Sequence, residues 1–346
     1  MSTVHPLPPL PEIPVRIARL DAIVLRCPIE TPVRTSFGTM RDRPAVFVRV
    51  EDDDGAVGWG ETWCNFPSCG AEHRAQLLET VIAPLAVGQR FASPAAAFDA
   101  MSKATAVLAI QSGEHGPLAQ AIAGLDLALW DLCARRRHEP LWRLLGGLSD
   151  RVEVYASGIN PDRPEDVVAA RRASGYRAFK LKVGFDDARD LANVAALRAV
   201  LGADAALMVD ANQGWSLEQA KRQARAFEPH RLGWIEEPLR ADRPAAEWAA
   251  LAASTSTPLA AGENLLGLDA FDEAVAARRY AVVQPDIAKW GGISGCWPVI
   301  ERVRAAGLRY CPHYLGAGIG LAASAHLLAA VGGDGLLEVD ANPNLL

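Results

Sequence analysis

The stretch Ala178-Phe179-Lys180-Leu181-Lys182-Val183-Gly184 is typical of a short β-strand that ends at a glycine. Side chains alternate along a strand, so Lys180 and Lys182 leave the same face near its carboxyl end. Two close ammonium groups repel each other and lose hydration, and both effects lower a lysine pKa toward the range of a general base. Strand lysines more often keep a sheet edge soluble. The stretch alone leaves both interpretations open, and the rest of the chain decides between them.

Similar strands recur through the second half of the chain, after Leu145-Gly146-Gly147. Eight short β-rich runs alternate there with helical stretches, and this alternation predicts a closed parallel barrel of the α/β class. An open, doubly wound sheet is the competing fold, but no Gly-x-Gly-x-x-Gly motif follows the first strand. The predicted strands are Val152–Ser157, Arg177–Val183, Ala206–Val209, Leu232–Ile235, Pro258–Ala261, Ala281–Val283, Leu308–Cys311 and Leu336–Val339.

The first half of the chain has its strands first and its helices afterwards, which is typical of an α+β unit. Ala45–Val50 and Ala56–Glu61 form a predicted hairpin around the turn Asp52-Asp53-Asp54-Gly55. Helical periodicity follows at Glu72–Leu85, Pro94–Ala106 and Ala119–Arg136, and composition predicts loops at Thr31–Arg43, Trp63–Gly70 and Gln111–Pro117. We therefore predict two domains, residues 1–145 and residues 146–346.

Composition excludes several classes of function. The chain has 346 residues, a formal net charge of −6 and no basic stripe, which argues against a nucleic-acid partner. Its six cysteines lack CxxC or zinc-like spacing and are predicted to be reduced thiols. The proline-rich residues 1–14 do not resemble a signal peptide, and no apolar run of membrane-spanning length is predicted. We expect a soluble, cytoplasmic homo-oligomer that does not bind membranes.

Polar residues stand at or just past the end of each barrel strand after the first. They are Lys182, Asp210, Glu236, Glu263, Asp286, His313 and Glu338, with successive gaps of 28, 26, 27, 23, 27 and 25 residues. In a parallel barrel these strand ends open on one rim, where the active sites of this fold lie. Helix capping explains a single acid at such a position, but it does not readily explain seven polar residues in register.

Three of these residues, Asp210, Glu236 and Glu263, are acids on neighbouring strands. Three converging carboxylates repel one another unless a cation lies between them, and ligation by oxygen alone favours Mg²⁺ over zinc. Asn212 and Asn264 are predicted to act as supporting or substrate-side amides. Glu237 should point away from the site and form a supporting ion pair.

Asp286 and His313 follow adjacent strands across the rim from Lys182. A carboxylate bound to one imidazole nitrogen fixes the tautomer and raises the basicity of the other nitrogen. The pair is therefore predicted to be a second acid/base group.

Together these residues resemble the mandelate racemase subgroup of the enolase superfamily, over nearly the whole chain. The likeness implies an N-terminal α+β capping domain over a (β/α)₇β TIM-like barrel. In that family a segment returning to the cap usually follows the last strand, whereas here residues 341–346 follow Asp340. The matching motifs are Lys180-Leu181-Lys182, Val209-Asp210-Ala211-Asn212, Trp234-Ile235-Glu236-Glu237-Pro238, Gly262-Glu263-Asn264, Pro285-Asp286 with Gly291-Gly292, His313, Glu338, Gly58-Trp59-Gly60-Glu61-Thr62, Gly124-Leu125-Asp126 and Trp130-Asp131-Leu132.

The resemblance also implies a chemistry, the Mg²⁺-assisted removal of a proton α to a carboxylate to give an enediolate. Asp210, Glu236 and Glu263 would bind Mg²⁺. Lys182 would be the base on one face of the substrate, and His313, held by Asp286, would be the acid/base on the other face. Lys180 would neutralise the substrate carboxylate, and Glu338 would hydrogen-bond an enediolate oxygen. The site must concentrate positive charge where the enediolate forms, because an α-proton is only weakly acidic.

The substrate is expected to be a small carboxylate chosen by the cap loops. Arg34 and Arg41 could meet anionic or hydroxylated groups, and Trp63 and Phe66 could shape the pocket. We expect dehydration of an acid sugar, with a racemase or epimerase of a 2-hydroxy acid as the alternative. Two further alternatives are a Schiff-base aldolase, which would use Lys180 or Lys182 covalently, and a binding protein without catalysis.

Overall fold

The computed structural model describes residues 6–35 and 38–346, and it begins with an antiparallel sheet. The sheet has the order β2-β3-β4, formed by β2 (Arg19–Arg34), β3 (Thr39–Glu51) and β4 (Val57–Thr62). A separate two-stranded ribbon pairs β1 (Val15–Arg16) with β5 (Arg90–Phe91). The hairpin predicted around residues 52–55 is therefore the β3–β4 connection.

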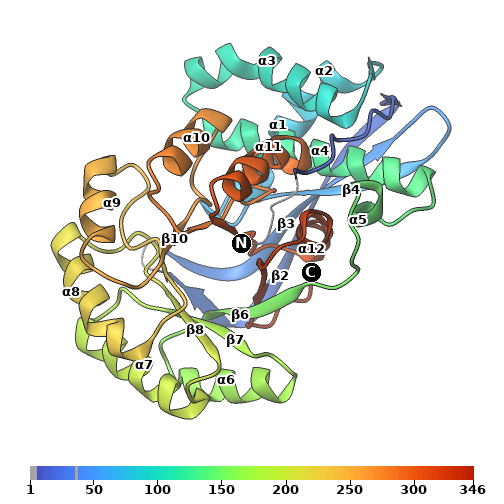
Figure 1. The fold of residues 1–346 in the computed structure, drawn as a ribbon. Coiled ribbons are helices and arrows are strands. Elements are labelled where there is room, and N and C mark those ends of the chain that lie inside the picture. The colour runs from blue at the N-terminus through green and yellow to red at the C-terminus, as the bar shows by residue number, and fades with distance from the viewer. Residues whose placement is uncertain (1–5, 36–37) are drawn as a thin grey trace.

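Helices of the N-terminal region follow this sheet. Figure 1 shows these helices, α1 to α4, in cyan and green, above most of the barrel helices in that view. The predicted helix at 72–85 is a continuous helical run that contains one π-helical turn, Leu78–Ile82. The helices are α1 (Gly70–Leu77), α2 (Ala83–Ala86), α3 (Pro94–Ser112), α4 (His115–Arg136) and α5 (Leu141–Leu144).

Two predicted loops are wrong. Residues 31–43 are mostly strand, because β2 and β3 pair again beyond an irregularity between Pro28 and Val33, and Val33 and Met40 are buried opposite each other. The predicted loop 111–117 shrinks to Gly113 and Glu114. Gly113 ends α3 with φ +72°, and Pro117 lies in the first turn of α4, where a missing backbone N–H costs nothing.

The second half of the chain forms eight parallel strands joined by seven helices. Observed strand bounds differ from the predicted ones by up to three residues. The strands are β6 (Glu153–Ile159), β7 (Ala178–Lys182), β8 (Ala206–Asp210), β9 (Ile235–Glu236), β10 (Leu259–Ala261), β11 (Val282–Val283), β12 (Arg309–Tyr310) and β13 (Leu336–Asp340). The helices are α6 (Pro164–Ala173), α7 (Asp187–Leu201), α8 (Leu217–Phe227), which a short 3₁₀ turn follows, α9 (Ala245–Ala252), α10 (Leu268–Ala276), α11 (Gly292–Ala305) and α12 (Gly318–Val331).

These strands curl into a nearly closed barrel. The sheet runs in the order β12-β11-β10-β9-β8-β7-β6-β13, so the first barrel strand, β6, pairs with the last, β13. The end strands meet where the Leu336 N–H donates to Cys311 Sγ at 3.4 Å. The predicted (β/α)₇β barrel with an N-terminal α+β domain is thus confirmed, and the boundary at residue 145 stays a prediction.

Helix α4 is the longest apolar helix of the described residues. By length and composition it could cross a membrane, so the prediction that no such run exists was wrong. However, 83% of its most apolar window is buried inside the protein, where α4 packs against β4, α3 and α11. It is therefore the central core helix of the N-terminal region.

Two glycines let β4 lie directly on α4. A Cβ atom added at Gly58 would lie 2.1 Å from the Ala128 carbonyl oxygen, and one at Gly60 would lie 2.1 Å from that of Gly124. Both obstacles are backbone atoms, which cannot rotate away. The strand and the helix are consequently locked together as one rigid unit.

Substituting Gly60→Ala should therefore lower the free energy of unfolding by about 3 kcal/mol, the upper end of the usual cost of overpacking. Gly116→Ala is the matched control, since a Cβ there meets only Gln120 Nε2, at 3.9 Å, and alanine favours a helix. Denaturant unfolding of the two variants measures the difference. Equal stabilities would contradict the close β4–α4 contact.

Candidate active site

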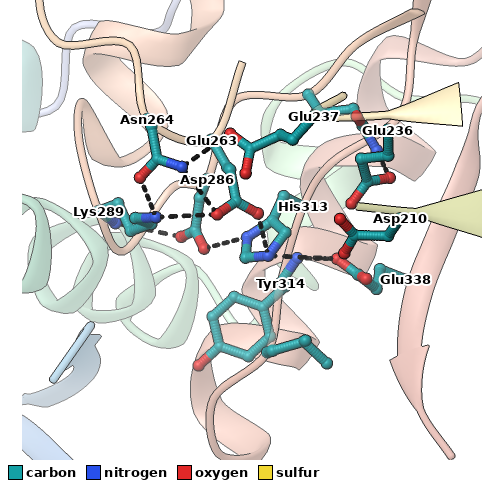
Figure 2. Close-up of polar contacts among 12 residues, drawn as sticks. Asp210, Glu236, Glu237, Glu263, Asn264, Asp286, Lys289, His313, Tyr314 and Glu338 are labelled. Carbon is teal, nitrogen blue, oxygen red and sulfur yellow. Dashed lines mark hydrogen bonds and ion pairs between the residues drawn. The ribbon is translucent and has the colours of Figure 1, made fainter. Parts of the chain in front are cut away.

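The seven predicted strand-end residues lie at one rim of the barrel, and Figure 2 labels all of them except Lys182. Lys182, Asp210 and Glu236 end strands β7, β8 and β9, and Glu338 lies within β13. Glu263, Asp286 and His313 follow β10, β11 and β12 by two or three residues. All seven are buried except Glu263, which is partly buried. Parallel strands thus bring together residues that lie up to 156 positions apart in the sequence.

Both lysines of β7 point into this rim and contact carboxylates. Lys180 Nζ contacts Glu236 and lies 2.7 Å from Glu338 Oε1. Lys182 Nζ donates to Asp210 Oδ2 at 2.5 Å and to Asn212 Oδ1 at 2.8 Å. The sequence had suggested lowered lysine pKa values, and this was wrong. Burial does lower the pKa of each lysine, but the facing carboxylates outweigh it and raise both pKa values.

Asp286 and His313 form a buried pair on the other side of the rim. His313 Nδ1 lies 2.7 Å from Asp286 Oδ2, and its Nε2 lies 2.5 Å from Glu263 Oε2. Asp286 Oδ1 accepts the backbone N–H groups of Ala288 and Lys289, at 2.8 and 3.1 Å, which orients the carboxylate. Burial lowers the pKa of His313, but Glu263 and Glu338 outweigh it and raise that pKa well above its usual value.

The three predicted metal ligands occupy neighbouring strand ends, and Asp210 pairs in register with Glu236. Their carboxylates nevertheless face different partners. Asp210 faces Lys182, and Glu263 faces His313. Glu236 accepts hydrogen bonds from Trp234 Nε1 at 3.0 Å and from Gln284 Nε2 at 2.6 Å. Within residues 6–35 and 38–346, no three His, Cys, Asp or Glu side chains surround one point. The expected convergence of these carboxylates is not present in the observed rotamers.

The composition of the rim still fits a divalent cation. Its six carboxyl groups outnumber its three lysines and one histidine by two. Burial, with Asp210 and Glu338, raises the pKa of Glu236 to about 7 although Lys180 opposes the shift. A hard cation among oxygen ligands would remove that penalty. The ten residues are Asp210, Glu236, Glu237, Glu263, Asp286, Glu338, Lys180, Lys182, Lys289 and His313.

The acid next to Glu236 does not behave as predicted. Glu237 has φ +41°, which breaks the alternation of the strand and turns its buried side chain toward Asn264 and Glu263 instead of away. Its Oε1 accepts Asn264 Nδ2 at 2.7 Å, and no ion pair joins it to a cation in the described part of the chain. Burial and the nearby Glu263 raise the pKa of Glu237 well above its usual value.

A cavity of about 230 Å³ opens above these residues, between the barrel and the N-terminal region. Lys182, Asn212, Glu263, Asn264 and His313 line its floor, and Val33, Met40, Trp63 and Phe66 line its other side. Trp63 is thus where the sequence placed it. The side chain of Arg34 lies outside the described residues, and Arg41 is exposed and absent from the lining. Arg43 lines the cavity and pairs with Asp340 at 2.5 Å.

Sequence reasoning missed Lys289. Its Nζ lies 2.7 Å from Asn264 Oδ1, 3.2 Å from Glu263 Oε1 and 4.8 Å from the centre of the Trp63 ring. Burial lowers the pKa of Lys289, but Glu263 and Asp286 outweigh it, so the side chain is a buried cation at the cavity wall. Its position three residues past Asp286, in a loop, is out of register with the strand ends, so the spacing argument did not include it.

A larger hollow, of about 1350 Å³, lies between β4, α4 and α12. None of the predicted site residues lines it. The smaller cavity is therefore the candidate active site, because it lies at the strand ends and is lined by Lys182, Glu263 and His313.

Two family models match the chain, one over the N-terminal region and one over most of the barrel. The mandelate racemase/muconate lactonizing enzyme N-terminal domain matches residues 19–146, and the enolase C-terminal domain-like model matches residues 163–345. The chain belongs to the mandelate racemase/muconate lactonizing enzyme family. The resemblance found in the sequence is thereby confirmed.

Two relatives are named for sugar-acid chemistry. The 3,6-anhydro-alpha-L-galactonate cycloisomerase of Streptomyces coelicolor is 35% identical, covering 80% of this chain and 76% of the relative. The D-galactonate dehydratase of Ralstonia nicotianae is 36% identical, covering 82% of this chain and 74% of the relative.

Solved structures of the family superpose over nearly the whole chain. A mandelate racemase/muconate lactonizing enzyme of Bordetella bronchiseptica has a TM-score of 0.91 and 63% identity, covering 96% of this chain and 89% of its own. A racemase of Streptomyces coelicolor with bound magnesium has a TM-score of 0.85 and 33% identity, covering 93% of this chain and 89% of its own. An enolase of Bradyrhizobium complexed with magnesium and mandelic acid has a TM-score of 0.84 and 30% identity, covering 94% of this chain and 88% of its own. The metal expected from the sequence is thus found in these two relatives.

Removing the charge of Lys289 should weaken the binding of small carboxylate anions in this cavity. We expect Lys289→Met to lower the affinity for malonate about tenfold, since losing about 1.4 kcal/mol of charge attraction has that effect. Calorimetry in excess magnesium measures it. Lys221→Met, which changes a lysine on helix α8 paired with Glu218, is the control and should bind malonate like the wild type. Unchanged affinity in Lys289→Met would show that this lysine serves only Glu263 and Asn264.

Proposed function

We propose that this protein is a Mg²⁺-dependent enzyme that removes the proton α to a carboxylate, and that its reaction is the dehydration of an acid sugar to a 2-keto-3-deoxy acid. The observation that carries the proposal is the pair of acid/base groups, Lys182 and His313, that line one cavity from β7 and from the end of β12. A dehydration needs one group to take a proton and a second to protonate the departing hydroxyl.

Asp210, Glu236 and Glu263 are the residues proposed to hold the metal, because they are the oxygen ligands at three neighbouring strand ends. Bound there, Mg²⁺ supplies positive charge for the carboxylate of the substrate. Trp234 and Gln284 orient Glu236 through its Oε2, and Asn264 orients Glu263 through its Oε1 at 3.0 Å. Such supporting hydrogen bonds hold ligand carboxylates in place.

Around the reacting carbon, each remaining side chain has a proposed role. Lys180 neutralises the substrate carboxylate, and Lys182 and His313 exchange protons on opposite faces. Asp286 holds the His313 ring through Nδ1, and proton transfer is assigned to Nε2, which faces Glu263 in this structure. Glu338 hydrogen-bonds an enediolate oxygen. Ser157 Oγ and the Tyr314 N–H donate to Glu338 at 2.5 and 2.9 Å and fix its orientation.

The substrate class is proposed to be an aldonate or aldarate. The D-galactonate dehydratase of Ralstonia nicotianae and the cycloisomerase of Streptomyces coelicolor both act on sugar acids by name. A polar wall suits a polyhydroxy chain. Hydrogen-bond donors and acceptors around the cavity come from Asn65, Asn212, Asn264, Arg43 and Lys289. Asn212 and Asn264 are proposed to contact the substrate, with Trp63 forming the apolar side.

Isomerisation is the second candidate, because the same two groups permit a proton to leave one face and return to the other. The related racemase of Streptomyces coelicolor and the mandelic acid in the Bradyrhizobium structure favour it. A Schiff-base aldolase would use Lys180 or Lys182 covalently, and borohydride trapping of the amine would reveal it. A binding protein without catalysis would leave these facing acids and bases unused. Cytoplasmic location and a homo-oligomeric state stay predictions.

The metal assignment predicts that Asp210→Asn, Glu236→Gln and Glu263→Gln each lower turnover of the accepted sugar acid by at least ~10²-fold. Each variant should also lose magnesium affinity, measured by calorimetry, because an amide is a weaker ligand than a carboxylate. Glu218→Gln, at an exposed acid of helix α8, is the control. Full turnover in excess EDTA would disprove the metal assignment.

Replacing either acid/base group should abolish net turnover, since each contributes ~10² to 10⁴ in rate. The partial reactions of Lys182→Ala and His313→Asn should differ. In D₂O, the variant that keeps the proton-abstracting group should still exchange the α-hydrogen of the substrate, as measured by NMR, and the other should not. Near wild-type turnover in both variants would require a mechanism that uses neither residue.

A further inference from the structure

Two buried acids of the N-terminal region bind the first turns of two barrel helices. Glu61, on β4, accepts the N–H groups of Ala317 and Gly320 at 2.6 and 2.9 Å, at the start of α12. Asp126, on α4, accepts the N–H groups of Ile293 and Ser294 at 2.7 and 3.0 Å, at the start of α11. Free N–H groups at a helix start carry partial positive charge and attract carboxylates. Each acid therefore links the N-terminal region to one barrel helix.

These two helices are the ones that follow the acid/base pair. The loop after β11 carries Asp286 and leads into α11 at Gly292, and the loop after β12 carries His313 and leads into α12 at Gly318. Ser294 strengthens the first link, because its Oγ donates to Asp126 Oδ1 at 2.5 Å. The two acids thus bind directly behind the two loops whose side chains form the Asp286–His313 hydrogen bond.

The segment after β4 contacts the same two loops nearer to Asp286 and His313. The Trp63 N–H donates to the Ala288 carbonyl oxygen at 3.2 Å, two residues past Asp286. Asn65 Nδ2 donates to the Leu315 carbonyl oxygen at 2.6 Å, two residues past His313. The N-terminal region accordingly contacts each loop both close to the acid/base residue and at the helix start.

Both acids belong to one rigid body. The close contacts of Gly58 and Gly60 with the α4 backbone lock β4, which carries Glu61, to the helix that carries Asp126. The spacing between the two carboxylates is therefore set within the N-terminal region. Because α4 packs on α11 and β4 packs on α12, that spacing is transmitted to the barrel.

Helix capping alone does not explain why carboxylates occupy these positions. Burial raises the pKa of Asp126 to about 7 and also raises the pKa of Glu61, so each carboxylate loses hydration that its hydrogen bonds do not fully replace. A serine or asparagine cap would satisfy exposed N–H groups without that penalty. A carboxyl group has two acceptor oxygens, so Asp126 accepts three hydrogen bonds from the start of α11 and Glu61 accepts two from the start of α12.

We propose that Glu61 and Asp126 are positioning residues that set the geometry of the Asp286–His313 pair from the N-terminal region. The proposal rests on the proposed function, in which His313 is an acid/base group. Proton transfer depends steeply on geometry, and a displacement of about 1 Å can cost ~10²-fold in rate. Loosening either loop should therefore impair the step that His313 performs without removing the substrate pocket.

The test compares Glu61→Ala and Asp126→Ala with Glu61→Gln and Asp126→Asn in the full-length protein with magnesium. Alanine removes every acceptor, whereas the amide variants keep one acceptor oxygen. We expect kcat to fall ~10²-fold in the alanine variants and ~10-fold in the amide variants, with KM changed less than ~3-fold. Circular dichroism at the assay temperature confirms that each variant is folded.

The control is Asp131→Ala. Asp131 lies on the same helix and accepts the Trp59 N–H at 2.8 Å, so it supports β4 without touching a barrel loop. It should lower stability and leave kcat unchanged. If Asp131→Ala lowered kcat as much as Asp126→Ala, or if the Glu61 and Asp126 variants all kept wild-type kcat, the positioning role would be overturned.

A second measurement does not depend on turnover. The ring proton of His313 bonded to Asp286 should give a downfield proton NMR signal, assigned by its loss in His313→Asn. The signal should move or broaden in Glu61→Ala and Asp126→Ala and stay in place in Asp131→Ala. A wild-type protein that turns over no sugar acid would refute the proposed function, while an unmoved signal in both alanine variants would refute the positioning role alone.

Discussion

Charge balance in a buried rim is the constraint on which the rest of the structure depends. Six carboxylates, three lysines and one histidine lie among the strand ends with little contact with water, where an isolated charge would cost several kcal/mol. Each lysine in this set therefore lies against a carboxylate, and His313 lies between two of them. The same pairing that makes the charges tolerable holds their side chains in fixed positions, as a site for proton transfer requires.

The pairing also sets what each group can do. Lys180 and Lys182 lie on one face of β7, yet each faces acids from other strands, and those acids outweigh both burial and lysine–lysine repulsion. In the same way, Lys180 and His313 bring the pKa of Glu338 down to about 2 although burial favours the protonated form. The properties of each residue thus come from partners 25 to 158 positions away in the chain.

The N-terminal region is more than a cover for the barrel. Two acids of its β4–α4 unit bind the starts of the helices that follow the loops of Asp286 and His313. Its Trp63 and Phe66 line the cavity next to these loops. The proposed substrate pocket and the proposed acid/base pair are therefore both contacted by one unit of the N-terminal region. Such a connection limits how freely this region can change, because β4 carries Glu61 and leads directly into the segment that lines the pocket.

Much of the fold and of the candidate site was predictable from the sequence. Strand periodicity and helical periodicity depend on local spacing, so the eight barrel strands and the helices of the N-terminal half could be located, with errors of up to six residues at their ends. The repeat of polar residues every 23 to 28 positions followed from the repeating β/α unit, and it brought Lys182, Asp210, Glu236, Glu263, Asp286, His313 and Glu338 to one rim. The long β2–β3 hairpin was missed because its pairing depends on burial of Val33 and Met40 against the rest of the protein.

Only the tertiary structure decided which residues of different strands and loops contact one another. The positive φ of Glu237 turns its side chain into the site instead of away from it. Lys289 lines the cavity from a loop, and neither strand nor helical periodicity predicts the position of a loop residue. The lysine pKa values rose because electrostatic energy depends on distance in space, which the spacing of residues along the chain does not report. By itself the sequence determined which chemical groups stand at each strand end, since that depends on local repeats. The fold determined which of those groups face one another, and therefore their charge.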